Sequence, residues 1–379
     1  IFMIDASKGF IKDGNKNRLR ALDIHRIVDT FTRQLEVPRY ARMVGLAEIS
    51  DAKNDFNLNL PRYIDSSEPE DLQDIDAHLR GGIPECDIDA LERYWQVLPA
   101  VRPLLFESAG RPGYSRLNMP AGEIKAAIFG HAEFTAFNAS VTALFAKWKK
   151  AHAPRLNAIK RGDHPKALIE TLSEELLAVF GKARLIDAYD VYQHVMDYWA
   201  ATMQDDVYLI AHAGWVEAAK PRLIVETKEQ KSKDVPDFTV GKQKFKSDLI
   251  PAALLIDRYF AAEQTSIEGI DAELGALEQH LDELREEHGG EGGLLEEVVD
   301  DKGKISRKAV AVRLKEISGD REYAEERMAL KDYDALLDQQ ADAKSRLRAA
   351  QEALEARVAA KYGKLTEAEI KVLVVDDKW

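Results

Sequence analysis

Residues 267–284 read IEGIDAELGALEQHLDEL. Their large apolar side chains recur at alternating spacings of three and four residues, which is the heptad pattern of a helix that packs one seam against another helix. The seam consists of Ile267, Ile270, Leu274, Leu277, Leu281 and Leu284. A long helix with a single apolar seam needs a partner, so this stretch predicts a mainly α-helical protein with a coiled-coil-like arm.

A second run with similar spacing extends from Asp320 to about Lys361 and includes Leu347 and Leu354. The Gly-rich stretch Gly289–Gly293 lies between the two runs and is predicted to be a flexible connector rather than a phosphate-binding loop, because it does not follow a strand. The first arm is acidic and the C-terminal half of the second is basic, so an antiparallel pair would place opposite charges beside the seam. Two interpretations of the seams stay open, an intramolecular hairpin and a surface for a partner helix.

The N-terminus reads as a single α/β unit. The apolar run Ile1–Ile4 is typical of a buried strand, and Asp23 is expected to cap a helix that follows a polar loop. The apolar positions of this helix are Ile24, Ile27, Val28, Phe31 and Leu35. One such unit cannot bury its own faces, so it is predicted to be the end of a larger α/β domain. This, and the sequences of both ends, lead us to expect that the chain is cut from a longer protein.

The remaining chain is predicted to be largely helical after a proline-rich stretch. One helix is expected over Asp87–Leu98, and another over Asp163–Phe180, with Pro165 in its first turn and Gly181 at its end. The expected parts of the chain are 1–60 as the tail of the α/β domain, 61–120 as an irregular linker region, 121–262 as a helical domain, 263–361 as the helical hairpin and 362–379 as the start of a further segment.

Composition narrows the class of protein. The chain has no apolar run near the roughly 20 residues of a membrane span and no visible signal peptide, and its one cysteine, Cys86, excludes an intrachain disulfide. We therefore expect a cytoplasmic protein. The net charge of −13 argues against nucleic-acid binding by the whole surface. One segment runs against this trend, and its lysines are candidate contacts for DNA phosphates: Lys228, Lys231, Lys233, Lys242, Lys244 and Lys246.

The residues alone indicate no complete active site, and none is assigned a catalytic, cofactor-binding or metal-binding role. Glu226 and Lys228 follow an apolar run and resemble part of a magnesium-dependent nuclease site, in which a carboxylate holds the metal and a lysine stabilises charge. Such a site also needs an acidic residue on a preceding strand, and Asp205 and Asp206 follow a helical segment instead. The nuclease is therefore kept as an alternative, and a surface strand or loop is the preferred interpretation.

Several blocks of sequence, taken together and in order, resemble a known family. They are IFMIDASKGFIKDGNKNRL, DIHRIVDTF, NLNLPRYIDSSEPEDLQDIDAHLRGGIP, DIDALERYW, KALIETLSEELLAVF, DVYQHVMDYWAATMQDDVYLI and LIVETKEQKSKDVPDF. The chain resembles the modification subunit of type I restriction–modification systems, which are S-adenosylmethionine-dependent N6-adenine DNA methyltransferases. The resemblance extends over nearly the whole chain.

The resemblance implies that this chain is one part of a larger assembly and that catalysis takes place in another part. In the family, a Rossmann-like catalytic domain precedes these blocks and carries an Asn-Pro-Pro-Phe motif and a Gly-rich loop for S-adenosylmethionine. The resemblance implies that the strand Phe2–Asp5 is one of the last strands of that sheet, so the N-terminal α/β part would be a remnant of it. No Asn-Pro pair occurs in this sequence. By itself, the chain is therefore expected neither to bind the cofactor nor to methylate DNA. The resemblance implies double-stranded DNA, a specificity subunit and a restriction subunit as partners.

The sequence thus predicts the C-terminal part of a type I modification subunit, with a local role in subunit assembly and in contact with DNA. Besides the nuclease, a helical scaffold that functions without any methyltransferase parent stays an alternative.

Overall fold

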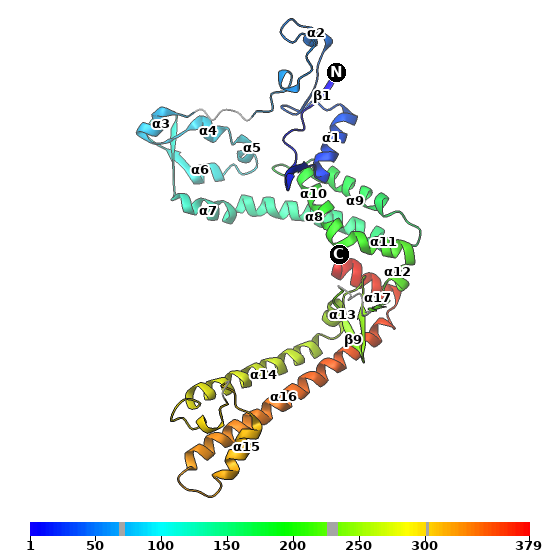
Figure 1. Cartoon of the computed structure of the whole chain (residues 1–379). Coiled ribbons are helices and arrows are strands. Elements are labelled where there is room, and N and C mark those ends of the chain that lie inside the picture. Colours follow the sequence, from blue (N-terminus) through cyan, green and yellow to red (C-terminus); the bar gives the residue numbers. More distant parts are fainter. Residues whose placement is uncertain (68–72, 226–233, 301–302) are drawn as a thin grey trace. The chain divides into compact units, whose positions relative to one another are not determined.

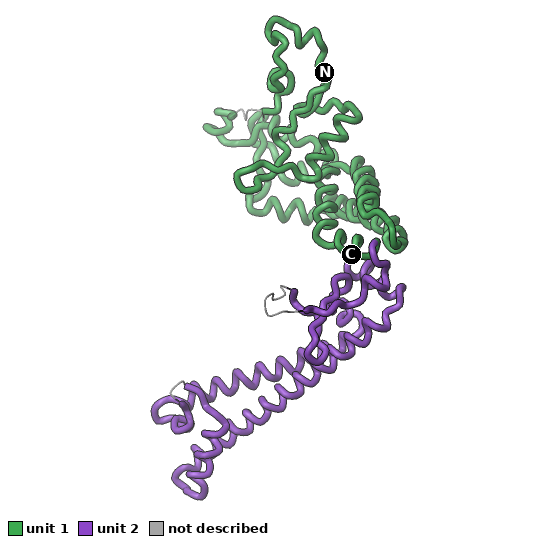
Figure 2. The backbone as a smooth tube through the Cα atoms, turned by 45° about the vertical axis from the view of Figure 1, so that its right-hand side comes forward, with its two compact units in different colours: residues 1–211 green, residues 212–379 purple. Residues whose placement is uncertain are grey.

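A computed structural model of the chain describes residues 1–67, 73–225, 234–300 and 303–379. It divides into two compact units, Ile1–Ala211 and His212–Trp379 (Figures 1 and 2). Long helices dominate both units, and the strands form only small antiparallel sheets. The prediction of a mainly α fold with a small N-terminal sheet is confirmed. The finer division into five parts stays a prediction. Within the described residues, no helix combines the length and the apolar character that a membrane span needs.

The first part of unit 1 contains two two-stranded sheets, β1-β4 and β2-β3, and one long helix. Its elements are β1 (Phe2–Ile4), β2 (Ile11–Asp13), β3 (Lys16–Arg18), α1 (Ala21–Arg33), β4 (Ala41–Met43), α2 (Leu46–Ile49) and the 3-10 turn η1 (Leu60–Arg62). Strand β1 pairs antiparallel with β4, in the register Met3↔Arg42. A small core of Met3, Val44, Ile49, Tyr63 and Ile64 anchors the sheet.

Helix α1 begins at Ala21, three residues earlier than a cap at Asp23 would place it. Asp23 is not the N-cap: it is the third helical residue, and its Oδ2 accepts a hydrogen bond from the backbone N of Arg20 at 2.9 Å. A carboxylate at this position satisfies one of the backbone donors at a helix start, as in the second half of a capping box. Asp23 thus bonds at the helix start as predicted, but from the third helical position instead of the N-cap position.

The second part of unit 1 contains a three-stranded sheet of order β5-β7-β6 among short helices. Its elements are α3 (Ile75–Arg80), β5 (Ile83–Pro84), α4 (Glu85–Asp89), α5 (Glu92–Trp95), α6 (Val101–Leu105), β6 (Phe106–Ser108) and β7 (Tyr114–Leu117). The single helix predicted over 87–98 is wrong in detail, because α4 and α5 are separate. The Trp95 indole Nε1 donates to the carbonyl of Ile88 at 2.6 Å across this break, so a side-chain contact replaces regular helix bonding there.

The third part of unit 1 is helical. It comprises η2 (Ala121–Glu123), α7 (Ile124–Gly130), α8 (Ala132–Asn157), α9 (Pro165–Phe180), α10 (Ala188–Tyr198), the π-helical segment η3 (Trp199–Met203) and α11 (Gln204–Ala213). As predicted, Pro165 is in the first turn of α9, and Gly181 follows its last residue. Leu176, fully buried, marks the face of α9 that packs inward.

Unit 2 begins with a small head around a three-stranded sheet of order β8-β10-β9. The elements of the unit are α12 (Trp215–Ala218), β8 (Arg222–Leu223), β9 (Phe238–Val240), β10 (Gln243–Lys246), α13 (Ala252–Tyr259), α14 (Ala261–His288), η4 (Glu296–Val298), α15 (Arg307–Glu316), α16 (Ala324–Tyr362), α17 (Glu367–Lys371) and the π-helical segment η5 (Val372–Lys378). Phe238 stacks on both Phe245 and Tyr362, with ring centroids 5.4 and 5.3 Å away, so the sheet is bound to the end of α16.

The rest of unit 2 is a helical hairpin formed by α14 and α16, which lie side by side (Figures 1 and 2). Ion pairs flank their contact: Arg346 with Glu273 at 2.7 Å, Lys344 with Glu278 at 3.0 Å, and Arg357 with Glu263. Helix α15, which the sequence did not predict, completes a separate tip core. The tip core comprises Leu281, Leu295, Val298, Val310, Ile317, Leu330 and Tyr333.

The Gly-rich connector is an ordered turn at the end of α14. Gly293 N donates to Gly290 O at 2.9 Å, and Leu295 N donates to His288 O at 2.8 Å. A Cβ added at Gly293 would lie 2.2 Å from the carbonyl oxygen of His288. This close approach of backbone to backbone explains the glycine there, since a side chain would force the turn open.

Gly293→Ala should therefore destabilise the tip of the hairpin by about 1 to 3 kcal/mol. Gly290→Ala is the matched control, because a Cβ there meets nothing within 4 Å, and should change stability by less than about 0.5 kcal/mol. Hydrogen exchange of the amides in α15 measures both effects. Equal protection in the two variants would show that the turn is not held in this conformation.

Candidate functional site

A polar cavity of about 240 Å³ lies in unit 1, where the loop after β1 meets the start of α1, the turn 37–40 and the start of α10. Four cations line it, Lys8, Arg20, Arg26 and Arg39, and so do four carboxylates, Asp5, Asp23, Asp187 and Asp190. Opposite charges balance, so the cavity has no net preference for an anion or a cation.

Asp23 is the best-held carboxylate of the cavity. Its side chain is 4% exposed and accepts hydrogen bonds from Arg20 Nε (2.9 Å) and Nη2 (3.0 Å) besides the backbone N of the same residue. The bonds from the Arg20 side chain hold the pKa of Asp23 below its ordinary value, although burial opposes this shift. A Cβ on Gly9 would lie 2.9 Å from the Asp23 carboxylate, so the loop after β1 approaches it closely only because residue 9 is glycine.

Asp5, at the end of β1, is the second buried carboxylate. It accepts a hydrogen bond from Ser7 N at 3.0 Å, and hydrogen bonds from Ser66 and Ser7 lower its pKa. Both buried carboxylates are thus ionised at neutral pH. A general base is most effective with a pKa near the working pH, so neither carboxylate is tuned for proton transfer. The charged groups of the cavity therefore have a structural role, because they lie where the β1 loop, α1 and α10 meet.

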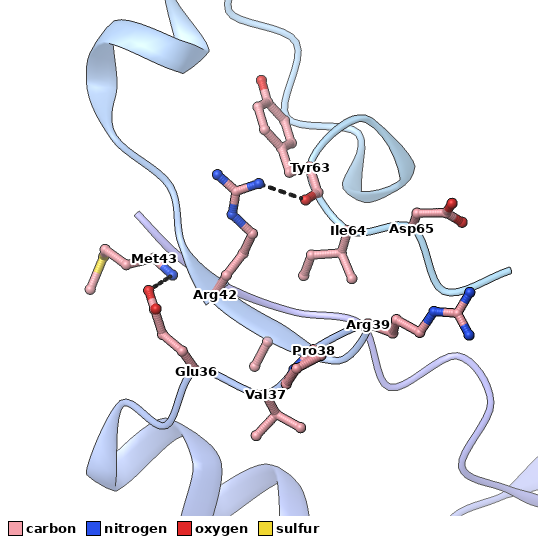
Figure 3. A pocket seen from close by; sticks show the side chains of 10 residues that line it. Glu36, Val37, Pro38, Arg39, Arg42, Met43, Tyr63, Ile64 and Asp65 are labelled. Carbon is pink, nitrogen blue, oxygen red and sulfur yellow. Dashed lines mark hydrogen bonds between the residues drawn. The ribbon is translucent and has the colours of Figure 1, made fainter. Parts of the chain in front are cut away.

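The same turn also borders an open recess of about 690 Å³, lined by residues 36–39, 41–43 and 63–65 (Figure 3). Arg42 Nη1 donates to the Tyr63 carbonyl at 3.2 Å, and Arg42 Nη2 donates to Glu48 Oε2 at 2.6 Å. Arg39 has a left-handed backbone conformation, with φ of 63°, which costs a non-glycine residue about 1 to 2 kcal/mol. Arg39 lines both the recess and the polar cavity.

Helix α1 packs in the opposite sense to the one that its apolar pattern predicts. Its polar side faces α10, where Tyr189 donates to Asp29 Oδ2 at 2.7 Å and Leu22 N donates to Gln193 Oε1 at 3.0 Å. Burial, together with this bond, raises the pKa of Tyr189, which stays protonated as the donor. Four of the five predicted apolar residues are exposed and form the α1 stripe, whereas Ile27 is half-buried. The exposed fractions in the stripe are Ile24 52%, Val28 56%, Phe31 64% and Leu35 36%.

Strand β1 likewise has an unpaired edge. Val44 N donates to Ile1 O (2.8 Å), and Asp5 N donates to Tyr40 O (2.7 Å), so the odd-numbered residues turn their backbone groups towards β4. Backbone groups alternate along an antiparallel strand, so those of Phe2 and Ile4 point to the other edge. No strand among the described residues pairs with that edge.

The lysines predicted to contact DNA are only partly within the described residues. Lys228, Lys231 and Lys233 lie outside them, as does the Glu226/Lys228 pair of the nuclease alternative. The others lie on the β9–β10 hairpin: Lys242 is exposed in its turn, and Lys244 and Lys246 share one face of β10. Lys246 is 3.5 Å from Asp237, so part of its charge is already neutralised within the chain. The role of these lysines in DNA contact stays a prediction.

The residues of the predicted seam lie inside the hairpin. Ile267, Leu281 and Leu354 are buried, and Ile270, Leu274, Leu277, Leu284 and Leu347 are half-buried along the contact between α14 and α16. In this chain, the seam side chains therefore pack within an intramolecular hairpin. A partner helix would have to meet the outer faces of the hairpin, and that role stays a prediction.

Comparison with known proteins gives one match. Residues 1–72 match the family model of the N-6 DNA methylases. The match includes β1, α1, β4 and most residues of the polar cavity and the open recess, so this segment is similar to adenine DNA methyltransferases. No curated protein and no solved structure matches the chain.

Proposed function

We propose that the chain is the C-terminal part of the modification subunit of a type I restriction–modification system. The parent enzyme would transfer a methyl group from S-adenosylmethionine to N6 of adenine in host DNA, in the cytoplasm. The observation that carries this proposal is the similarity of residues 1–72 to N-6 DNA methylases. No residue of this chain is proposed to bind the cofactor, and the chain by itself is expected to be inactive.

Two exposed features of the matched segment support a larger catalytic domain. The free edge of β1 can pair with a further strand, and the α1 stripe lies on the helix that follows it. An unpaired strand edge and a contiguous apolar stripe are both unfavourable in water and are usually covered. Further strands beside β1, with α1 packed on their face, would cover both features at once.

The proposed local role of the chain is assembly. The outer faces of the hairpin would contact the specificity subunit, which reads the DNA sequence, and the restriction subunit would join the same complex. Ion pairs between α14 and α16 hold the two helices of the hairpin together, so its outer faces would be the ones to meet a partner. The lysines of the β9–β10 hairpin would contact DNA phosphates in the assembled complex.

Variants of the α1 stripe test the proposal. Replacing Ile24, Val28 and Phe31 with glutamine should leave the thermal unfolding of the 379-residue chain almost unchanged, because each side chain is more than half exposed. The same changes in the enzyme expressed from the whole gene, with its specificity subunit, should abolish most transfer of tritiated methyl groups to DNA, since α1 would no longer pack on the sheet.

The matched control replaces three exposed apolar residues that lie outside both α1 and the hairpin with glutamine: Ile75, Leu79 and Val216. Methylation by this variant should stay within about twofold of the wild type, as expected for surface changes. Full methylation by the α1 variant would contradict the proposal that the stripe packs on a catalytic sheet.

A further inference from the structure

A strongly basic segment lies in the helical part of unit 1, outside the segment that matches the N-6 DNA methylases. Residues 147–166 read KWKKAHAPRLNAIKRGDHPK and contain seven lysines and arginines against one acid, Asp163. This excess of positive charge stands in a chain whose net charge is −13. A pass along the sequence for local charge would have found it, and its density exceeds that of the lysines at 228–246.

The structure turns these cations outwards. The segment is the C-terminal part of α8, the loop 158–164 and the first turn of α9 (Figure 1). Trp148 and His152 face α9: the Trp148 indole Nε1 donates to Leu172 O at 3.2 Å, and His152 is 4% exposed, with its Nε2 3.2 Å from Glu175. Lys147 and Lys150 are three residues apart and therefore share a face of α8. This face points away from the side that Trp148 and His152 turn towards α9.

The loop holds two further cations in place. Gly162 N donates to the carbonyl of Ala211 at 2.8 Å, which ties the loop to α11. The Asp163 carboxylate accepts a hydrogen bond from the backbone N of Lys160 at 3.0 Å, so the one acid of the segment stabilises the turn. Lys160 and Arg161 are exposed on this ordered loop.

Among the described residues, an ion pair neutralises one of these seven cations. Arg155 pairs with Glu175 at 3.1 Å. The other six cations form no ion pair with any residue of the described ranges, and all six are exposed. They form what we call the basic surface: Lys147, Lys149, Lys150, Lys160, Arg161 and Lys166.

We infer that the basic surface binds the phosphate backbone of double-stranded DNA without reading its sequence. The choice of DNA rests on the proposed function, and the charge of the surface is its independent support. Five of the six cations are lysines, which act as point charges towards phosphates, whereas base edges are read by bidentate side chains such as Arg, Asn and Gln. Asn157, the one Asn or Gln of residues 147–166, already uses its amide to donate to Ala153 O at 2.9 Å. The surface would therefore add affinity and leave specificity to another part of the complex.

The test compares two variants of the 379-residue chain that have the same net charge. The first carries Lys147→Gln, Lys150→Gln, Lys160→Gln and Arg161→Gln. The control carries Lys308→Gln, Lys315→Gln, Lys331→Gln and Arg321→Gln, which are exposed cations without ion pairs among the described residues. Fluorescence anisotropy with a labelled duplex of arbitrary sequence gives the binding constant over a range of KCl concentrations, and circular dichroism checks that both variants are folded.

The first variant should bind the duplex at least about tenfold more weakly, and the slope of log K against log[salt] should fall by about 0.9 for each phosphate that the protein no longer neutralises. The control should keep the wild-type slope. Equal reductions of affinity in the two variants, or no binding by the wild type at the lowest salt, would overturn the inference. Tighter binding to phosphatidylserine vesicles or to polyglutamate than to the duplex would overturn DNA as the partner. The α1-stripe assay measures methylation, whereas this one measures DNA binding. Failure of the proposed function and failure of this inference can therefore be told apart.

Discussion

Leu330→Ala should lower the stability of the hairpin tip by about 2 to 5 kcal/mol, which is the usual cost of deleting a large side chain from a well-packed core. Leu330 is completely buried in the tip core, where α16 meets α14 and α15. The shortened side chain would leave a cavity among Leu281, Val310 and Tyr333, which the three helices cannot close without moving.

The tip core is separate from the head of unit 2, so the effect should be local. Amides of α15 and of the adjoining end of α16 should lose protection against hydrogen exchange by at least about 30-fold, while amides of α13 keep theirs. Met328→Ala is the control on the same helix, because Met328 is 66% exposed. A similar drop in protection in the two variants would contradict the packing of this tip.

Asp23→Asn should destabilise unit 1 by about 1.5 to 3 kcal/mol at neutral pH, the range for hydrogen bonds to a charged group. The amide keeps the shape of the side chain but loses the charge that faces Arg20. Arg20 is 34% exposed and can turn towards water, which limits the destabilisation. The exposed pair of Asp13 and Arg18 gives the control, because both side chains are more than 60% exposed. Asp13→Asn should therefore have almost no effect.

The effect of Asp23→Asn should also depend on pH in one direction. The folded-state pKa of Asp23 is lower than its unfolded value of about 3.9, so the carboxylate adds stability above that pH and loses it as the pH falls through the folded-state pKa. Urea unfolding of the wild type and the variant at a series of pH values measures this. The difference between them should be constant from neutral pH to about pH 5 and shrink below about pH 4. A difference that is independent of pH would contradict the ionised pair.

The helical hairpin could be predicted because its cause is local. Spacings of three and four along residues 267–284 place the apolar side chains on one face, and this face is the buried one. The same reasoning predicted helix α1 but not which of its faces is covered. The α1 stripe has the pattern of a buried face, yet it is exposed. Periodicity shows which side of a helix is apolar, but it does not show which element covers that side.

The polar cavity could not be predicted, because its residues are distant in sequence. Asp23 and Arg26 from α1 meet Tyr189 from α10 through tertiary packing alone. Local contacts also override propensity at 87–98, where the Trp95 indole bonds to a backbone carbonyl between two short helices. The basic surface, in contrast, could have been found by counting charges along 147–166.

The central claim is that residues 1–72 complete the catalytic domain of an adenine methyltransferase. Sequencing the gene on the 5′ side of the Ile1 codon tests this claim most directly. The account predicts an in-frame Gly-rich loop after a strand, followed by an Asn-Pro-Pro-Phe motif. A start codon immediately before Ile1, preceded in frame by a stop codon, would contradict it and would favour a helical scaffold without methyltransferase activity.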